Sequence, residues 1–154
     1  MQSKELLSEV ASVKSALYRS IEAILQASDR YCATFPQSVK DGLPFYADAK
    51  SNASAAYYMY ATALTYVLKS AENSIALLSP ISKRADENGY SDVSEQCVAL
   101  LSAYEAFSKD ALSPYFEASQ SIILSGGESL SLTSLYHATR VLQQRSEEFL
   151  EKLS

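Results

Sequence analysis

Few side chains in this sequence have the types and spacing that catalysis or metal binding requires. His137 is the only histidine, and Ser134 stands three positions before it. The chain therefore lacks the ligand sets of most zinc sites and the Glu-x-x-His pairs of di-iron bundles. No acidic residue lies within one helical turn of His137, and no Gly-x-x-x-x-Gly-Lys-Ser/Thr phosphate loop is present. We predict no metal ion, no cofactor and no enzymatic activity.

The stretch His137-Ala138-Thr139-Arg140 places a basic residue three positions after the histidine. This spacing resembles that of histidine phosphotransfer domains, which are four-helix bundles with an exposed histidine. Those domains continue with a small residue, usually glycine, where this chain has Val141. The resemblance covers four residues and implies a phosphotransfer protein that uses His137. The alternative is an ordinary histidine at the surface or boundary of a bundle.

Cys32 and Cys97 are the only cysteines. The pattern places Cys32 near the end of the first predicted helix and Cys97 near the start of the third. In an up-and-down bundle these positions lie at opposite ends, roughly 40 Å apart at 1.5 Å rise per residue. A disulfide needs Cα atoms within about 7 Å, so we predict two free thiols.

Tyrosine is unusually frequent, with eleven residues and no tryptophan. At 100° per residue, Tyr57, Tyr60 and Leu64 lie on or beside the apolar seam of the second predicted helix. The opposite side of that helix carries further apolar or amphipathic residues: Ala55, Tyr58, Met59, Thr62 and Tyr66. Either this helix is central in the bundle, or its outer face meets another chain, since Tyr and Met are enriched in interface cores.

The segment from Tyr60 to Val67, Tyr-Ala-Thr-Ala-Leu-Thr-Tyr-Val, is similar to the second helix of MIT-type trafficking domains. That resemblance spans about eight residues and implies a domain that binds helical peptides in a groove between helices. The charged third-helix pattern of that family is not evident here. No binding residue is carried over from it.

Charge is unevenly distributed in a chain whose net charge is −5. Residues 85–128 hold eight acidic residues and one basic residue, a local net charge of −7. This balance argues against nucleic-acid binding, which needs clustered Lys and Arg. The acidic segment is either a solvated helix face or a docking surface for a basic partner, with Glu95, Glu105 and Asp110 as the candidate contacts.

Four long runs with apolar residues at steps of three and four must position these side chains. The first run extends to about Phe35, ahead of Pro36. Its predicted seam is Leu6, Val10, Val13, Leu17, Ile21, Ile24 and Tyr31. After a loop with Asp41-Gly42 and Pro44, the second run extends from Phe45 to Leu78. Its seam includes Tyr60, Ala63 and Val67.

Ser79-Pro80 predicts a bend or a short separate helical turn over 80–87, followed by a reversal at Gly89. Asp92-x-x-Glu95 predicts a capping box at the start of the third helix, with Ser91 as a competing cap. We expect Pro114 to kink that helix near 110–114 without shifting the register of its seam. The predicted seam is Val93, Cys97, Leu100, Tyr104, Phe107, Ala111, Ala118 and Ile122.

Gly126-Gly127 is predicted to end the third helix, and the last helix then follows. Its predicted seam is Leu132, Leu135, Ala138, Leu142, Phe149 and Leu153. The fold class is therefore all-α: one domain over residues 1–154, an antiparallel up-and-down four-helix bundle with a kinked third helix.

The function that this sequence favours is a non-enzymatic protein–protein interaction module: an adaptor or scaffold subunit, or a domain of a larger protein. It would bind a partner helix or self-associate through helix faces, with no nucleic acid and no membrane span. The candidate contacts on the second helix are Tyr58, Met59, Thr62 and Tyr66. The absence of a signal-peptide apolar region predicts a cytoplasmic location.

Overall fold

The first long helix, α1, spans Gln2–Cys32 in the computed structural model, which describes residues 2–35, 37–41, 46–47, 52–124 and 130–154. All seven residues of its predicted seam, from Leu6 to Tyr31, are buried. Steps of three and four keep these side chains on one side of a helix with 3.6 residues per turn. The seam prediction for α1 is confirmed.

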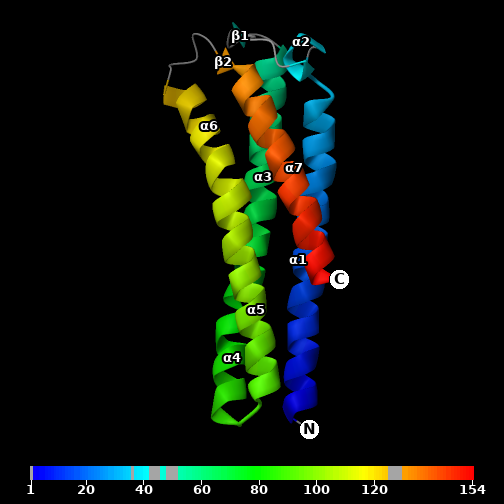
Figure 1. Ribbon diagram of the computed structural model, residues 1–154, viewed down its shortest axis with the longest axis vertical. Coiled ribbons are helices and arrows are strands. Elements are labelled where there is room, and N and C mark those ends of the chain that lie inside the picture. The colour runs from blue at the N-terminus through cyan, green and yellow to red at the C-terminus, as the bar shows by residue number, and fades with distance from the viewer. Residues whose placement is uncertain (1, 36, 42–45, 48–51, 125–129) are drawn as a thin grey trace.

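A short helix and a small strand pair lie between the long helices at one end of the bundle (Figure 1). The helix is α2 (Gln37–Lys40). The two-residue strands β1 (Tyr46–Ala47) and β2 (Leu130–Ser131) pair antiparallel, and the all-helical prediction did not include them. The predicted helix-ending and loop positions Pro36, Gly42, Pro44 and Gly126-Gly127 lie outside the described residues.

The second run folds as two helices, α3 (Asn52–Ala76) and α4 (Leu78–Glu87), separated at Leu77. Over residues 56–76 of α3, the buried side chains are Tyr57, Tyr60, Leu64, Leu68, Ala71 and Ser74. The prediction that Ala63 belongs to the seam is wrong, because Ala63 is exposed and Leu68 is buried instead. A strict heptad seam drifts around a straight 3.6-residue helix, and the observed seam follows the helix.

The short helix predicted after Ser79-Pro80 is present as α4, although it begins at Leu78. Pro80 therefore lies in the first turn, where its missing N–H would have no intrahelical partner. Gly89, with φ of +78°, makes the predicted reversal after α4. The N–H of Tyr90 donates to the carbonyl of Ala85 at 2.8 Å across this turn.

The third run begins with α5 (Ser91–Phe107). Tyr90 occupies the N-cap position and makes no side-chain capping bond there. The predicted capping by Asp92 and Glu95, or by Ser91, is therefore wrong. The helix is held instead by packing of its buried residues Val93, Cys97, Leu100 and Phe107.

A π-helical turn, η1 (Ser108–Leu112), joins α5 directly to α6 (Ser113–Leu124). The N–H of Ser113 donates to the carbonyl of Ser108, five residues back, just before Pro114. A π turn contains one extra residue, so the buried face moves by one position. Tyr115 and Ser119 are buried and Ala118 is only half-buried, so the prediction of an unshifted register is wrong.

The last helix, α7 (Leu132–Leu153), packs against α1 and α6. Its predicted seam is confirmed from Leu135 to Leu153, where all five residues are buried. The C-terminal end of α7 lies partway along α1, whereas α4 and α5 pack beside α1 towards the other end (Figure 1). The architecture is a bundle of long α-helices around one hydrophobic core.

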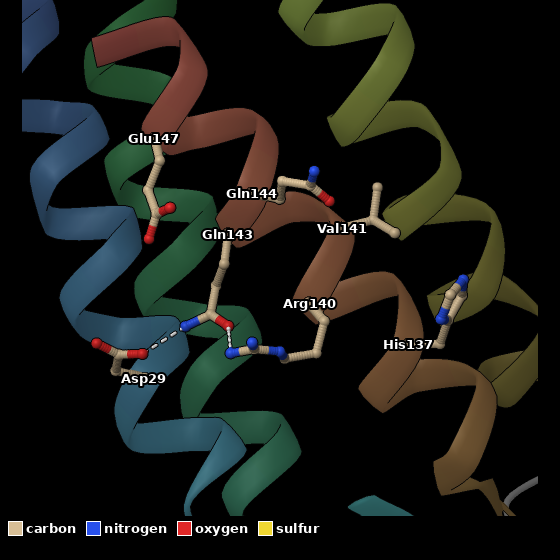
Figure 2. A pocket seen from close by; sticks show the side chains of 7 residues that line it. All are labelled: Asp29, His137, Arg140, Val141, Gln143, Gln144 and Glu147. Atoms are coloured by element: carbon tan, nitrogen blue, oxygen red, sulfur yellow. Dashed lines mark hydrogen bonds between the residues drawn. The ribbon is translucent and has the colours of Figure 1, made fainter. Parts of the chain in front are cut away.

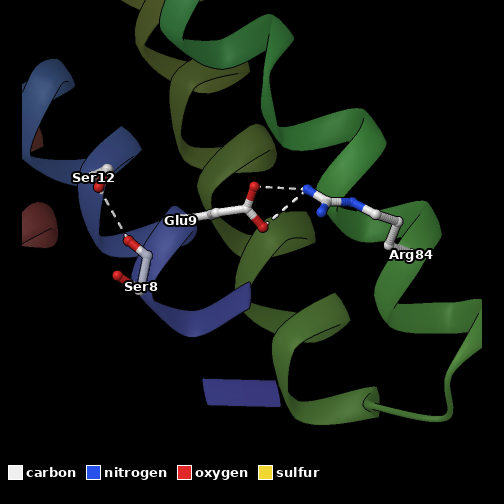
Figure 3. Close-up of polar contacts among 4 residues, drawn as sticks. All are labelled: Ser8, Glu9, Ser12 and Arg84. Carbon is white, nitrogen blue, oxygen red and sulfur yellow. Dashed lines mark hydrogen bonds and ion pairs between the residues drawn. The ribbon is translucent and has the colours of Figure 1, made fainter. Parts of the chain in front are cut away.

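An ion pair joins α4 to α1 near the lower end of the bundle (Figure 3). The Arg84 Nη2 group donates to both carboxylate oxygens of Glu9, at 2.8 and 2.9 Å. Both side chains are well exposed, so solvent screens this pair and it contributes little to stability. The buried residues Leu78, Ile81 and Ala85 anchor α4 to the core.

Candidate functional site

The outward face of α3 carries three large side chains that nothing in the described structure covers. Tyr58 is 56% exposed, Met59 75% and Tyr66 82%. Thr62 is also exposed, on the turn between the two tyrosines. The structure thus brings together all four contacts predicted on this helix.

The division of the tyrosines follows from helix geometry. Tyr57 and Tyr60 point towards the core and are 3% and 5% exposed, respectively. At 100° per residue, Tyr66 lies about 180° around the helix from Tyr57, and Tyr58 lies about 160° from Tyr60, so both project away from the core. The Thr62 hydroxyl donates to the carbonyl of Tyr58 at 2.8 Å, which leaves the Thr62 methyl group for contact.

Two hollows are built around these residues. The first, of about 700 Å³, is an open depression lined by Tyr58, Met59, Thr62, Ala63, Tyr66 and Val67. The second, of about 310 Å³, lies between α1 and α3 and is lined by Ala16, Arg19, Ser20, Ala23, Tyr66, Val67 and Ser70. Tyr66 stands between them and lines both.

This face lacks charge over an unusual length. The 18 residues between Lys50 and Lys69 contain no Asp, Glu, Lys, Arg or His, in a chain where 20% of residues are charged. The first hollow is lined by no charged residue, and Arg19 is the one charged residue that lines the second. A helix face exposed to water normally carries charged residues opposite its apolar stripe, and this one does not.

The acidic candidates do not join this face. Glu95 and Glu105 are exposed on α5, ten residues and about 15 Å of helix rise apart. Asp110 is exposed on η1 and lies near Arg145 of α7. The pKa of Arg145 is raised mainly by its hydrogen bond to Glu148, and Asp110 adds to the effect. The three acids therefore form no single docking surface with the α3 residues.

A polar cleft of about 320 Å³ lies between α1 and α7 (Figure 2). Gln143 of α7, only 5% exposed, links its two sides. Its Nε2 donates to Asp29 Oδ1 on α1 at 2.6 Å, and its Oε1 accepts from Arg140 Nη1 at 2.8 Å. The thiol of Cys32 also donates to that oxygen, at 3.8 Å. The Nε2 and Oε1 atoms of the buried amide both have hydrogen-bond partners, and these bonds offset the cost of removing the amide from water.

His137 is exposed and lines the same cleft. In Figure 2 the Arg140 side chain extends towards Asp29, whereas the His137 ring extends away from α1. Two carboxylates, Asp29 and Glu147, also line the cleft. The histidine and the arginine that the sequence pairs therefore share a cleft but point in different directions.

Buried phenols form a further cluster at the end of α1. The rings of Tyr31 and Tyr60 stack at 4.5 Å, and Tyr115 meets Tyr60 edge-on at 5.8 Å. Among the described residues, none of these three hydroxyls has a hydrogen-bond partner. Burial raises the pKa of each of the three above its usual value, and neighbouring phenols raise it further. At Tyr115 the neighbouring Ser119 hydroxyl opposes this shift in the pKa. The cluster packs the core and opens into neither of the two hollows.

The cysteines are buried and free, as predicted. Burial raises the pKa of the Cys32 thiol to about 11, with Asp29 raising it further and Arg140 opposing the shift. In the described ranges, no three His, Cys, Asp or Glu side chains are grouped so that they could hold a metal ion. None of the described helices combines the length and apolar character needed to cross a bilayer.

Sequence reasoning missed two components of these sites. Ser70 and Arg19 complete the second hollow, but a hollow between two helices depends on how the helices pack, and no pattern in either helix shows it. Gln143 reads as a surface residue, since glutamine is mostly exposed. Gln143 directly follows the buried Leu142 and lies one turn before the buried Ser146, but its burial depends on the packing of α7 against α1.

No protein-family model, curated protein or solved structure matches this chain.

Proposed function

We propose that this chain is a non-enzymatic protein-interaction module, an adaptor or scaffold subunit, that buries the outer face of α3 against a helix of low charge. The observation that carries the proposal is the exposure of Tyr58, Met59 and Tyr66 around an uncharged hollow. Scattered exposed apolar residues are ordinary, but a contiguous group of large ones marks an interaction surface.

The chemistry of the face favours binding by burial. Tyrosine and methionine offer large contact areas and are enriched at the centres of interfaces. Burying a large apolar side chain contributes about 1.5–3 kcal/mol, so Tyr58, Met59 and Tyr66 would supply a substantial part of the free energy that offsets the entropic cost of association. With so little charge, the face would bring little electrostatic steering, and its association rate should depend weakly on salt.

The finer architecture belongs to the same proposal. In this proposal the fold is an up-and-down four-helix bundle. Its first and fourth helices are α1 and α7, its second is formed by α3 with α4, and its third by α5, η1 and α6 together. The reversal at Gly89 and the packing of α1 on both α3 and α7 support this order. Within this proposal the third helix bends at the π turn before Pro114, since π turns are among the identifiable causes of helix kinks. Two free cysteines support a cytoplasmic location, where thiols stay reduced.

Site-specific photocrosslinking in cells tests the interaction surface. A benzophenone amino acid would replace Tyr58 or Tyr66 in turn, and cross-linked products would be resolved by mass. We expect both positions to give a discrete adduct, because each side chain would be covered by the partner. Val98, exposed at 54% on α5, is the matched control and should give none.

The mass of the cross-linked adduct also identifies the class of partner. A short helical peptide would support the likeness to MIT-type domains, and a larger protein would support an adaptor role. If neither Tyr58 nor Tyr66 gives an adduct while the variants keep their helical circular dichroism, the α3 face is not an interaction surface and the proposal is wrong.

A second candidate function is histidine phosphotransfer through His137. Its support is that His137 is exposed and lines a cleft with Arg140. The carboxylates of Asp29 and Glu147 in that cleft would oppose an added phosphate, which ranks it second. A label that is stable in alkali, labile in acid and lost in His137→Gln would support it.

A further inference from the structure

The exposed face of α3 contains a regular alternation of large and small residues. Tyr58, Thr62, Tyr66 and Ser70 follow one another at steps of four and so form one continuous row on the helix surface. The two tyrosines project from this row. The two small residues line the two hollows, Thr62 the first and Ser70 the second.

The spacing of projections equals the spacing of hollows. Tyr58 and Tyr66 are eight residues apart, as are Thr62 and Ser70, which is about 12 Å of helix rise. If a second copy of the row is laid antiparallel on the first, Tyr66 falls opposite Thr62 and Tyr58 falls opposite Ser70. The symmetry repeats each pairing in both copies, so each of the four tyrosines lies opposite a hollow of the other copy.

Helix packing provides a geometry in which two such rows run alongside each other. Rows at steps of four interdigitate when two helices cross at about −50°, the commonest class in globular proteins. A two-fold axis relates the two copies in the antiparallel arrangement. The contact then closes on itself and yields a dimer rather than a chain of subunits.

The charges agree with this arrangement. The first hollow has no charged lining residue, so no like charges meet when two copies come together. The second hollow contains Arg19, which makes no ion pair with any described residue. A tyrosine ring placed there lies against a guanidinium group, a favourable cation–π contact.

We infer that the partner of the α3 face is a second copy of this chain, in an antiparallel two-fold dimer. In this dimer Tyr66 of each copy occupies the hollow at Thr62 of the other. Tyr58 of each copy occupies the hollow at Ser70 and Arg19 of the other. The inference rests on the proposed function, because it names the partner for the same surface.

Exchanging the residue types at positions 62 and 66 tests the register directly. Dimerisation of purified protein would be measured by sedimentation equilibrium, with the monomer at 16.8 kDa. Thr62→Tyr alone should place two tyrosines opposite each other, and Tyr66→Thr alone should leave an empty hollow. Each should weaken the dimer by about tenfold or more. The double variant Thr62→Tyr, Tyr66→Thr should restore the dimer, because each contact again pairs Tyr with Thr.

Two further variants keep the test independent of how the exchange variant folds. Ser70→Phe should fill the second hollow and weaken the dimer, whereas Ser102→Phe on the exposed side of α5 should not. Arg19→Ala should weaken it by removing the cation that receives Tyr58. Circular dichroism and the unfolding midpoint confirm that each variant keeps the fold.

The outcomes separate this inference from the proposed function. A wild-type dimer that responds to none of these variants, or whose loss is not reversed by the exchange, places the contact elsewhere and overturns the inference. A wild-type monomer whose Tyr58 and Tyr66 still cross-link another protein in cells overturns the dimer but leaves the interaction module standing. A monomer with no adduct at either position overturns both.

Discussion

At the scale of single residues, the tyrosines divide into two populations with different chemistry. Tyr58 and Tyr66 are exposed on the outer face of α3. Tyr31, Tyr60 and Tyr115 bury their rings against one another and leave their hydroxyls unpaired within the described structure. A buried hydroxyl without a partner costs about 1–3 kcal/mol of stability, so these three rings pack the core at a cost.

Removing one of those hydroxyls should therefore not destabilise the protein. Tyr60→Phe keeps the ring that stacks on Tyr31 and removes only the unpaired group. We expect the free energy of unfolding in urea at pH 7 to stay the same or rise by about 1 kcal/mol. Tyr66→Phe, at an 82% exposed position, is the control and should leave it unchanged. A loss of about 1 kcal/mol or more in Tyr60→Phe would show that a bound water satisfies the hydroxyl.

At the scale of helices, the contact between α1 and α7 combines an apolar seam with one polar network. Leu135 and Leu142 pack fully buried in the seam. Beside them, Gln143 connects Asp29 of α1 to Arg140 of its own helix. An apolar seam alone tolerates sliding, whereas a buried amide with two fixed partners favours one register of α7 on α1.

Replacing Gln143 should cost much more than replacing its neighbour. Gln143→Ala removes the hydrogen bonds to Asp29, Arg140 and Cys32 and leaves Asp29 without its 2.6 Å partner. We expect the free energy of unfolding to fall by about 2–3 kcal/mol, because a bond to a charged group is lost and a cavity forms. The adjacent Gln144 is exposed, and Gln144→Ala should change it by less than about 0.5 kcal/mol. Equal small losses in both variants would show that the network does not hold the helices together.

The helices differ in how much of their buried seam could be predicted from the sequence. α1 and α7 were predicted with their buried seams because each has one amphipathic stripe that only a helix can gather on one side. In α3, apolar or amphipathic residues surround the helix, so Ala63 and Leu68 could not be told apart by type. In the third run, the extra residue of η1 moved the seam to Tyr115, and a proline alone does not reveal that a π turn precedes it.

The candidate site was predicted in part for the same reason. Tyr58, Met59, Thr62 and Tyr66 were placed together because they share one side of a single helix. The hollow at Arg19 and Ser70 joins two helices, and its existence depends on their packing distance. The acidic positions Glu95, Glu105 and Asp110 were grouped by local charge alone, which does not report where side chains point.

At the scale of the whole molecule, the distribution of serine and of core residues argues for one cooperative unit. Serine is a poor helix former, yet serines occur throughout the long helices, and several are buried. Each long helix therefore depends for its stability on packing against the others, in a core to which every long helix contributes. A change that weakens the phenol cluster at one end should be felt as a loss of global stability.

Alkaline unfolding tests that cooperativity. The pKa values of Tyr31, Tyr60 and Tyr115 are raised in the folded state, chiefly by burial. The folded state thus keeps protons that the unfolded chain loses above about pH 10. Their contribution to stability is complete below pH 10 and is lost as the pH rises, by about 1.4 kcal/mol per pH unit for each tyrosine.

We therefore expect the urea midpoint to be nearly constant from pH 7 to about pH 8.5 and to fall gently above that, because the folded state keeps the Cys32 and Cys97 protons that the unfolded chain loses. Above about pH 10 the buried tyrosines should make the fall steep. Tyr31→Phe should flatten that fall by removing one of the tyrosine titrations, while Tyr66→Phe, at an 82% exposed position, should leave the profile unchanged. A Tyr31→Phe profile as steep as that of the wild type would mean that this phenol ionises without unfolding the bundle. The end of the bundle that holds the phenol cluster would then open locally, ahead of the rest of the core.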